Sequence, residues 1–343
     1  MANDRRKLDR RQFIRRATGL GAGLTAASFS GCDTRVAQSQ NPPPPTPPPT
    51  PAGKSQLVLA KHDRSVLGGQ IDASVAAEML EGAMLKLTGA DTARDAWGSL
   101  FSADEVVGVK INCLFGIGAS THPEVTSAVV AGLIAGGVKP DNIIVWDRAD
   151  KDLLKSGYEI KRDGPGPRCY GTDGAYEPEA TKHRSFNGRL TKILTEDIDA
   201  LVNVPILKDH GISGITVSMK NHYGSFDNPN KHHGNHCDPY IADFNSLGVV
   251  RQKSRLIVCD ALLPVANGGP RARPEHTWPY RGMLVGQDPV ALDQWGWQIL
   301  EERRAAVGLP TLAEANRAPR QLESAASLGL GTNDQEQIDL VEV

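Results

Sequence analysis

The sequence predicts an α/β fold: one large domain built on a largely parallel sheet with helices on both faces. Two observations carry this prediction. From residue 57 onward, short apolar runs that suit strands alternate with longer stretches of helical periodicity. Several of the apolar runs also lack a polar face, as expected for strands that are buried on both sides.

The strands are predicted at residues 57–60, 106–111, 143–146, 201–204, 256–259 and 283–285. Apolar side chains recur every four positions over 75–87, which predicts a helix. A second helix is predicted over 123–135, because proline suits its first position and Gly136-Gly137 suits its end. Residues 161–189 are rich in Gly, Pro and charged side chains, so we expect an irregular excursion there.

The first 32 residues are typical of an export signal. Arg10-Arg11 precede a Gly- and Ala-rich apolar run that ends at Phe29 and is too short to be a finished membrane span. This order resembles a twin-arginine signal, which a translocase of folded proteins reads. A nucleic-acid-binding tail is the alternative, but such a tail is not followed by an apolar run. We therefore expect export by the twin-arginine (Tat) translocase to the cell envelope.

Gly31-Cys32 resembles a lipid-attachment site, with plain cleavage after Ala27 as the alternative. If Cys32 is acylated, resemblance to bacterial lipoproteins places the protein on the periplasmic or outer face of the inner membrane. Residues 33–55 form a proline-rich tether, whose tract at 42–51 suits a semi-rigid spacer or a site for a proline-reading module. The α/β domain then spans residues 56–343.

Composition disfavours several other classes. The formal charge of −2 indicates no nucleic-acid partner, and no later run is long and apolar enough to span a membrane. The five cysteines include no CxxC pair, so the sequence encodes no iron–sulfur motif or zinc ribbon. Phosphate-loop and dinucleotide glycine patterns are missing as well.

Polar side chains follow the ends of the predicted strands, where parallel strands of an open sheet form a ligand crevice. They include Lys110, Asn112, Asp147, Asn203 and Asp260. A turn or cap is the commoner role for any one such residue, so their recurrence carries the prediction.

A segment after the fourth strand brings Lys208, His210 and Lys220 close together in sequence. Neighbouring cations lower one another's pKa and suit a carboxylate or phosphate ligand. A solvated basic loop is the equal alternative. Further on, Asp288 is expected to cap a helix that begins at Pro289, whereas Asp293 is less easily explained by capping.

The densest run of metal-capable side chains comprises His232, His233, His236 and Cys237. Imidazole and thiolate bind divalent transition metals such as zinc, copper or nickel, and a Gly-containing loop can wrap them around one ion. We expect at least two of these donors, with Asp238, to approach each other. The alternative is a polar loop held by hydrogen bonds.

Together these segments resemble the DUF362 family, a domain of unknown function. The matching pieces are VVGVKIN (106–112), THPEV (121–125), NIIVWD (142–147), LVNVPILKDHGISGITVSMKNHYG (201–224), the strand that ends in Asp260, and GQDPVALD (286–293). The resemblance implies an α/β domain of unassigned activity. It marks these positions: Lys110, Lys208, His210, Lys220, Asn221, Asp260, Asp288 and Asp293. Many members carry an added ferredoxin module, for which this chain has no cysteine pattern.

Our leading hypothesis is an envelope enzyme or binding protein whose cleft uses Lys110, Lys208, His210 and Lys220 for an anionic small molecule. Asp260 and Asp293 would serve as acid, base or orienting groups. The alternatives are a metal-binding or redox accessory protein that uses the histidine run, and a non-catalytic envelope scaffold.

Overall fold

A ten-stranded sheet is the central element of residues 54–343, which are the residues that the computed structural model describes. The predicted signal and all but the last two residues of the tether lie outside this range. The main path of the sheet runs β14-β1-β13-β12-β9-β4-β5-β6, and β10 and β11 attach through β12. The neighbours from β12 to β6 are parallel, whereas β13 runs antiparallel to both β1 and β12. The predicted α/β class with a largely parallel sheet is confirmed.

The strands of this sheet have the following bounds: β1 Ser55–Lys61, β4 Val107–Ile111, β5 Ile143–Asp147, β6 Arg168–Gly171, β9 Ala200–Val204, β10 Ile206–His210, β11 Gly214–Thr216, β12 Ser254–Val265, β13 Gly282–Gly286 and β14 Ile338–Glu342. Two small hairpins pair β2 (Val66–Leu67) with β3 (Gln70–Ile71) and β7 (Thr181–His183) with β8 (Phe186–Gly188). All six predicted strands are present.

The helices are α1 Ala73–Thr88, α2 Ala93–Gly98, α3 Pro123–Ala135, α4 Asp150–Lys155, α5 Ser218–Asn221, α6 Tyr240–Asn245, α7 Gly248–Lys253, α8 Pro289–Ala306 and α9 Gln321–Ser327. Both predicted helices are confirmed, and α3 begins and ends at the predicted residues. Asp288 caps α8 as expected, since its side chain accepts hydrogen bonds from the backbone N–H groups of Val290 and Ala291.

The excursion at 161–189 is more regular than predicted. It contributes the edge strand β6 and the hairpin of β7 and β8, and Phe186 of that hairpin is 1% exposed. These segments are only three or four residues long, so the surrounding Gly, Pro and charged residues hide their pattern in the sequence.

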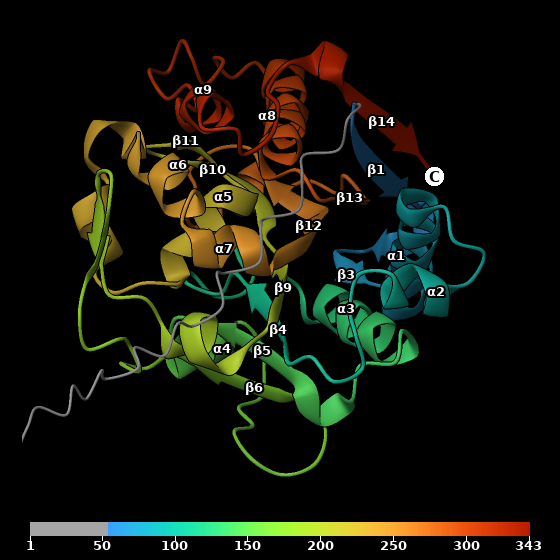
Figure 1. Cartoon of the computed structure of the whole chain (residues 1–343). Coiled ribbons are helices and arrows are strands. Elements are labelled where there is room, and N and C mark those ends of the chain that lie inside the picture. Colours follow the sequence, from blue (N-terminus) through green and yellow to red (C-terminus); the bar gives the residue numbers. More distant parts are fainter. Residues whose placement is uncertain (1–53) are drawn as a thin grey trace, which may run out of the picture. The chain divides into compact units, whose positions relative to one another are not determined.

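The two faces of the sheet carry separate apolar cores. Figure 1 shows α1, α2 and α3 on one side and α5, α6 and α7 on the other. Side chains alternate along each strand, so Val107, Val109 and Ile111 of β4 pack toward α1–α3. Lys110 lies between two of them and therefore points to the opposite face, where α5 lies.

Replacing Asp288 tests how much the cap of α8 contributes to the stability of the fold. Asp288 Oδ1 accepts two backbone N–H bonds of 2.9 Å, while Oδ2 accepts 2.5 Å from Ser55 Oγ and 3.0 Å from the Thr332 backbone N–H. Asp288→Ala should therefore lower the free energy of unfolding by about 2 kcal/mol, the upper end for a lost cap. The control is Asp72→Ala, because Asp72 caps α1 through local hydrogen bonds alone. Urea unfolding checks this, and equal losses in both variants would contradict it.

Candidate functional site

The carboxyl ends of β4, β5 and β9 place three polar side chains beside one another. Lys110 lies opposite Asn203 of β9 and opposite Trp146 of β5, and Asp147 follows Trp146 directly. Parallel neighbours end at the same edge of the sheet, so the spacing in the sequence translates into one row of side chains.

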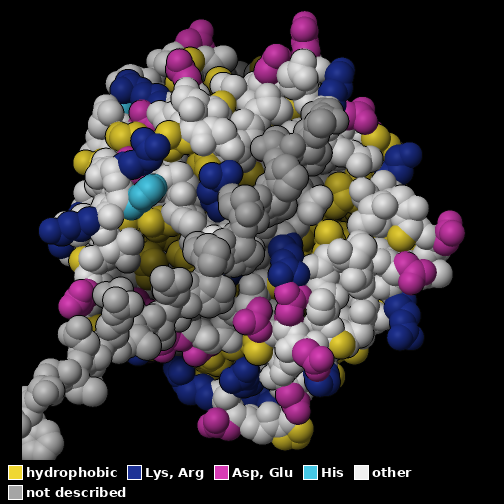
Figure 2. All heavy atoms as spheres, viewed as in Figure 1, with side chains coloured by type: hydrophobic (Ala, Val, Ile, Leu, Met, Phe, Trp, Pro, Cys, Tyr) yellow, Lys and Arg dark blue, Asp and Glu magenta, His cyan; other side chains and the backbone are white. Residues whose placement is uncertain are grey.

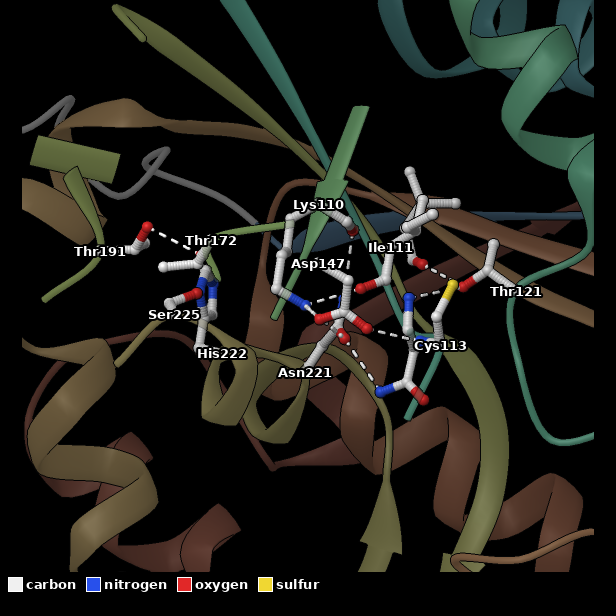
Figure 3. Close-up of polar contacts among 12 residues, drawn as sticks. Lys110, Ile111, Cys113, Thr121, Asp147, Thr172, Thr191, Asn221, His222 and Ser225 are labelled. Atoms are coloured by element: carbon white, nitrogen blue, oxygen red, sulfur yellow. Dashed lines mark hydrogen bonds and ion pairs between the residues drawn. The ribbon is translucent and has the colours of Figure 1, made fainter. Parts of the chain in front are cut away.

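A buried ion pair anchors this row. Lys110 Nζ lies 2.8 Å from Asp147 Oδ1, and the two side chains are 0% and 5% exposed. Lys110 also donates to the Ile111 carbonyl at 2.6 Å, and Asp147 Oδ2 accepts 2.6 Å from the Cys113 backbone N–H (Figure 3). Gly224 closes over the pair, because a Cβ there would stand 2.5 Å from Asp147 Oδ1 and 2.8 Å from Lys110 Nζ.

Asn221 of α5 joins the strands through both ends of its amide. Its Nδ2 donates to Asn203 Oδ1 at 2.7 Å and to the Lys110 carbonyl at 3.2 Å. Its Oδ1 accepts from Lys110 Nζ at 3.3 Å and from Asn112 Nδ2 at 3.0 Å. Figure 3 shows Asn221 directed at this cluster. The arrangement fixes α5, and with it the neighbouring Lys220, against the sheet edge.

Asp293 holds the start of α5. It reaches from α8 and accepts 2.7 Å from the Ser218 backbone N–H, 2.5 Å from Ser218 Oγ and 3.2 Å from the Met219 backbone N–H. Burial raises the pKa of Asp293 to about 7, against the hydrogen bonds from Ser218 and Met219, which lower it. Asp293 therefore positions the segment that carries Lys220, a capping role that the sequence analysis judged less suited to it.

Lys208 is buried without a carboxylate. It is 1% exposed, and its Nζ donates to Asn112 Oδ1 at 2.8 Å and to the Ala119 carbonyl at 2.5 Å. No ion pair within residues 54–343 includes it. The pKa of Lys208 is lowered to about 7, chiefly by burial; the charge of Asp147 opposes this shift and that of Lys220 adds to it.

Lys220 likewise has no carboxylate among the ion pairs of the described residues. It is 6% exposed, and its Nζ lies 3.4 Å from His233 Nε2, 3.7 Å from Cys237 Sγ and 3.6 Å from the centre of the Tyr223 ring. Burial lowers the pKa of Lys220 to about 8, although Cys237 raises it. This lysine therefore loses its proton more readily than an exposed one.

His210 is a neutral hydrogen-bond donor. Its Nδ1 accepts from the backbone N–H groups of Ile212 at 3.1 Å and Ser213 at 3.2 Å, so the ring proton sits on Nε2. Burial first, and then the charge of Lys220, lowers the pKa of His210 to about 2. Its ring stacks on that of His233 with centres 5.8 Å apart. His210 thus contacts His233, the neighbour of Lys220, but it cannot supply a positive charge at neutral pH.

Asp260 does not join the lysines. Its Oδ2 lies 2.6 Å from His122 Nδ1 and accepts 2.9 Å from the His122 backbone N–H. Val258 and Leu262 flank it two positions away and pack with α1–α3, so alternation along β12 turns Asp260 to that face, away from Lys110. Burial lowers the pKa of His122, but the attraction of Asp260 outweighs it and the net pKa is raised. The expectation that Asp260 acts within the lysine cleft is therefore wrong: it pairs with His122, and Asp147 is the carboxylate beside Lys110.

The four predicted metal ligands do not gather around one point, although His233 and Cys237 both lie beside Lys220. His232 stacks on Phe186, and His233 Nε2 faces Lys220. His236 is exposed and bonds the Ile212 carbonyl, whereas the buried Cys237 Sγ lies beside Lys220. Within residues 54–343 no group of three or more His, Cys, Asp or Glu side chains is arranged to hold a metal ion.

The reason is local backbone geometry. Asn235, His236 and Cys237 have φ angles of 48°, 61° and 65°, a left-handed turn that rotates successive side chains apart. Such φ values are uncommon for residues other than glycine, and no pattern in the sequence predicts them at these positions.

An open cavity of about 570 Å³ borders His233, which contacts Lys220. It is lined by Gly211, Ile212, His233, Asn235, His236, Ala315, Asn316 and Arg317. His233 belongs both to this lining and to the surroundings of Lys220, so it connects the cavity with that lysine. On the face drawn in Figure 2, basic and acidic side chains are mixed, which shows no broad basic patch there.

Some residues of the site were passed over at the level of sequence. Asp147 and Asn112 were noted at strand ends but were not assigned to the site, although recurrence at strand ends was the available signal. Gly224 and His122 lie inside segments of the DUF362 resemblance, yet only the packed structure shows what each contacts.

Comparisons with known proteins identify a family but no activity. A family model described as Domain of unknown function (DUF362) matches residues 107–298. A crystal structure of a Thermotoga maritima protein from the Northeast Structural Genomics Consortium aligns with 71% of this chain at 12% identity and a TM-score of 0.37. The chain covers 60% of that protein. No curated protein is significantly similar.

Breaking the buried ion pair should destabilise the fold. Lys110→Met leaves the Asp147 carboxylate buried without its cation, and Asp147→Asn leaves the lysine without its anion. Each should lower the free energy of unfolding by about 3 kcal/mol, since one buried charge then lacks compensation. The double variant should lose clearly less than the sum. Denaturant unfolding of the four proteins measures the coupling, and additive losses below about 1 kcal/mol each would contradict a buried ion pair.

Proposed function

We propose that this chain, which belongs to the DUF362 family, binds an anionic small molecule beside Lys208 and Lys220. The matched region, residues 107–298, contains both lysines, and no activity is assigned to the family. One observation carries the proposal: two lysines are almost fully buried, and the charge of Lys220 acts to lower the pKa of Lys208, yet no ion pair within residues 54–343 includes either of them.

Burial of a cation without an anion is costly. A lysine in such surroundings either loses its proton or acquires a negative partner. Lys110 has Asp147, but Lys208 has only neutral oxygen acceptors and Lys220 has a ring face, an imidazole and a thiol. A bound carboxylate or phosphate would supply the missing charge and restore the protonated lysines.

Two further donors support an anion here. Thr216 lies directly opposite Lys208 in the antiparallel pair of β10 and β11, so both side chains stand on the same face of that pair. Thr216 is 3% exposed and its Oγ1 has no hydrogen-bond partner among the described residues. His210, two positions from Lys208 on the same strand, carries its proton on Nε2. A hydroxyl and an N–H donor beside a lysine suit an oxyanion.

Anion binding should appear as stabilisation that depends on these lysines. A panel of phosphate, oxalate, pyruvate and citrate is tested by thermal unfolding at constant ionic strength. At least one anion should raise Tm, because a ligand at about 100 times its Kd stabilises the folded state by about 3 kcal/mol. Lys208→Met and Lys220→Met should abolish the rise.

Lys182→Met is the matched control, since it removes the same charge from an exposed position in β7. The control should respond like the unaltered protein. A rise in Tm that survives in both site variants, or an equal loss in the control, would place the binding elsewhere and end the proposal.

We also propose that the protein acts in the cell envelope. The supporting features are Arg10-Arg11, the apolar run that follows and Gly31-Cys32, with the proline-rich tract at 42–51 as a spacer. A lipid on Cys32 would supply membrane attachment. No helix of the described residues is long and apolar enough to cross a membrane.

Export should depend on one particular arginine pair. Arg10→Lys with Arg11→Lys keeps the charge but removes the guanidinium groups, so the precursor should stay in the cytoplasm with its leader uncut. The control is Arg5→Lys with Arg6→Lys, which alters another pair of the same arm and should be exported normally. Cell fractionation followed by immunoblotting measures both. Normal export of the first variant would contradict a twin-arginine signal.

A further inference from the structure

We propose that Lys220 is an amine nucleophile that forms an imine with the carbonyl group of a small α-keto acid. The inference rests on the proposed anion site and specifies its ligand class. Lys208, with Thr216 and His210, would bind the carboxylate, while Lys220 would meet the adjacent carbonyl carbon.

The contacts of the three buried lysines separate their roles. Lys110 is paired with Asp147, with Nζ 2.8 Å from Oδ1. Lys208 donates to two oxygen acceptors, which hold its Nζ in place as a charge. Lys220 Nζ has neither a carboxylate nor a carbonyl acceptor among its described contacts, and the centre of the Tyr223 ring lies 3.6 Å away. Of the three, Lys220 is therefore the lysine whose amine is not held as a donor to an oxygen acceptor.

His233 presents an unprotonated ring nitrogen, Nε2, to the Lys220 amine. Its Nδ1 lies 3.0 Å from the Pro229 carbonyl, which can only accept, so Nδ1 carries the ring proton. The lone pair is therefore on Nε2, which faces Lys220 Nζ at 3.4 Å. Burial, and then the charge of Lys220, lowers the pKa of His233 to about 4, so the ring is neutral near pH 7.

The side-chain amides of Asn112 and Asn221 connect Lys208 to the segment that carries Lys220, an arrangement that suits a short ligand. Asn112 binds Lys208 Nζ through Oδ1 and the Asn221 side chain through Nδ2, and Asn221 directly follows Lys220. One amide thus joins the proposed carboxylate site to the segment that presents the amine. His233 also lines the open cavity, which gives a small molecule a path to the amine.

The chemistry balances without a further reactant. The neutral Lys220 amine attacks the carbonyl carbon, a C–N bond forms, and the π electron pair moves to the carbonyl oxygen, which takes up a proton from solvent water, so that the final product is a protonated imine. His233 Nε2 accepts a proton from the nitrogen of the resulting carbinolamine and returns it to the hydroxyl group. The C–O bond then breaks, water leaves, and the C=N bond forms.

Reductive trapping tests the inference. The full-length protein is incubated with glyoxylate or pyruvate and sodium cyanoborohydride near pH 7, and peptide mass spectrometry locates the carboxyalkyl adducts. Lys220 should be labelled about tenfold faster than exposed lysines such as Lys182, because a larger fraction of its amine is neutral. Lactate, which has the carboxylate but no carbonyl, should slow this labelling.

Two variants separate this inference from the anion site. Lys220→Arg keeps the cation but cannot form an imine, so it should lose the adduct and still be stabilised by lactate. Lys208→Met keeps the amine and should lose both lactate binding and the preference for Lys220. If lactate or pyruvate raises Tm but labelling falls evenly on exposed lysines, the anion site stands and the imine inference is overturned. If neither anion raises Tm and no lysine is preferred, both fail.

Discussion

The ion pair between Lys110 and Asp147 is the interaction on which the rest of the site depends. It occupies the carboxylate at the end of β5, and the Asn221 amide then ties β4, β9 and α5 to it. Because α5 is fixed in this way, Lys220 is held at the sheet edge beside His233, Cys237 and the Tyr223 ring, with no carboxylate among these contacts. Since Asp147 is paired with Lys110, it does not form an ion pair with Lys208 or Lys220.

The fold was largely predictable because its strongest signals are local. Continuous apolar runs gave the buried strands, and caps gave the helix ends, as at Asp288 and Gly136. Short strands such as β7 and β8 were missed, since three residues do not establish a period. The antiparallel place of β13 depends on long-range pairing, which no local pattern specifies.

The site was predictable in its cations but not in their partners. Residue type and position at strand ends singled out Lys110, Lys208 and Lys220. Which carboxylate contacts which lysine depends on the face of the sheet to which each strand residue points. Asp260 points to the face of His122, whereas Asp147 lies beside Lys110. The histidine run illustrates the same limit, because the left-handed turn at 235–237 separates side chains that are adjacent in sequence.

We propose that Lys208 and Lys220 are buried amines with lowered pKa values that become fully protonated when an anion binds. Nitrogen-15 NMR of the lysine side chains tests this directly, with Lys208→Arg and Lys220→Arg used to assign the two Nζ signals. Both should titrate well below the ordinary lysine pKa of about 10.4, and both pKa values should rise when a binding anion is added. Two signals that titrate near 10.4, with pKa values that no added anion changes, would contradict this proposal.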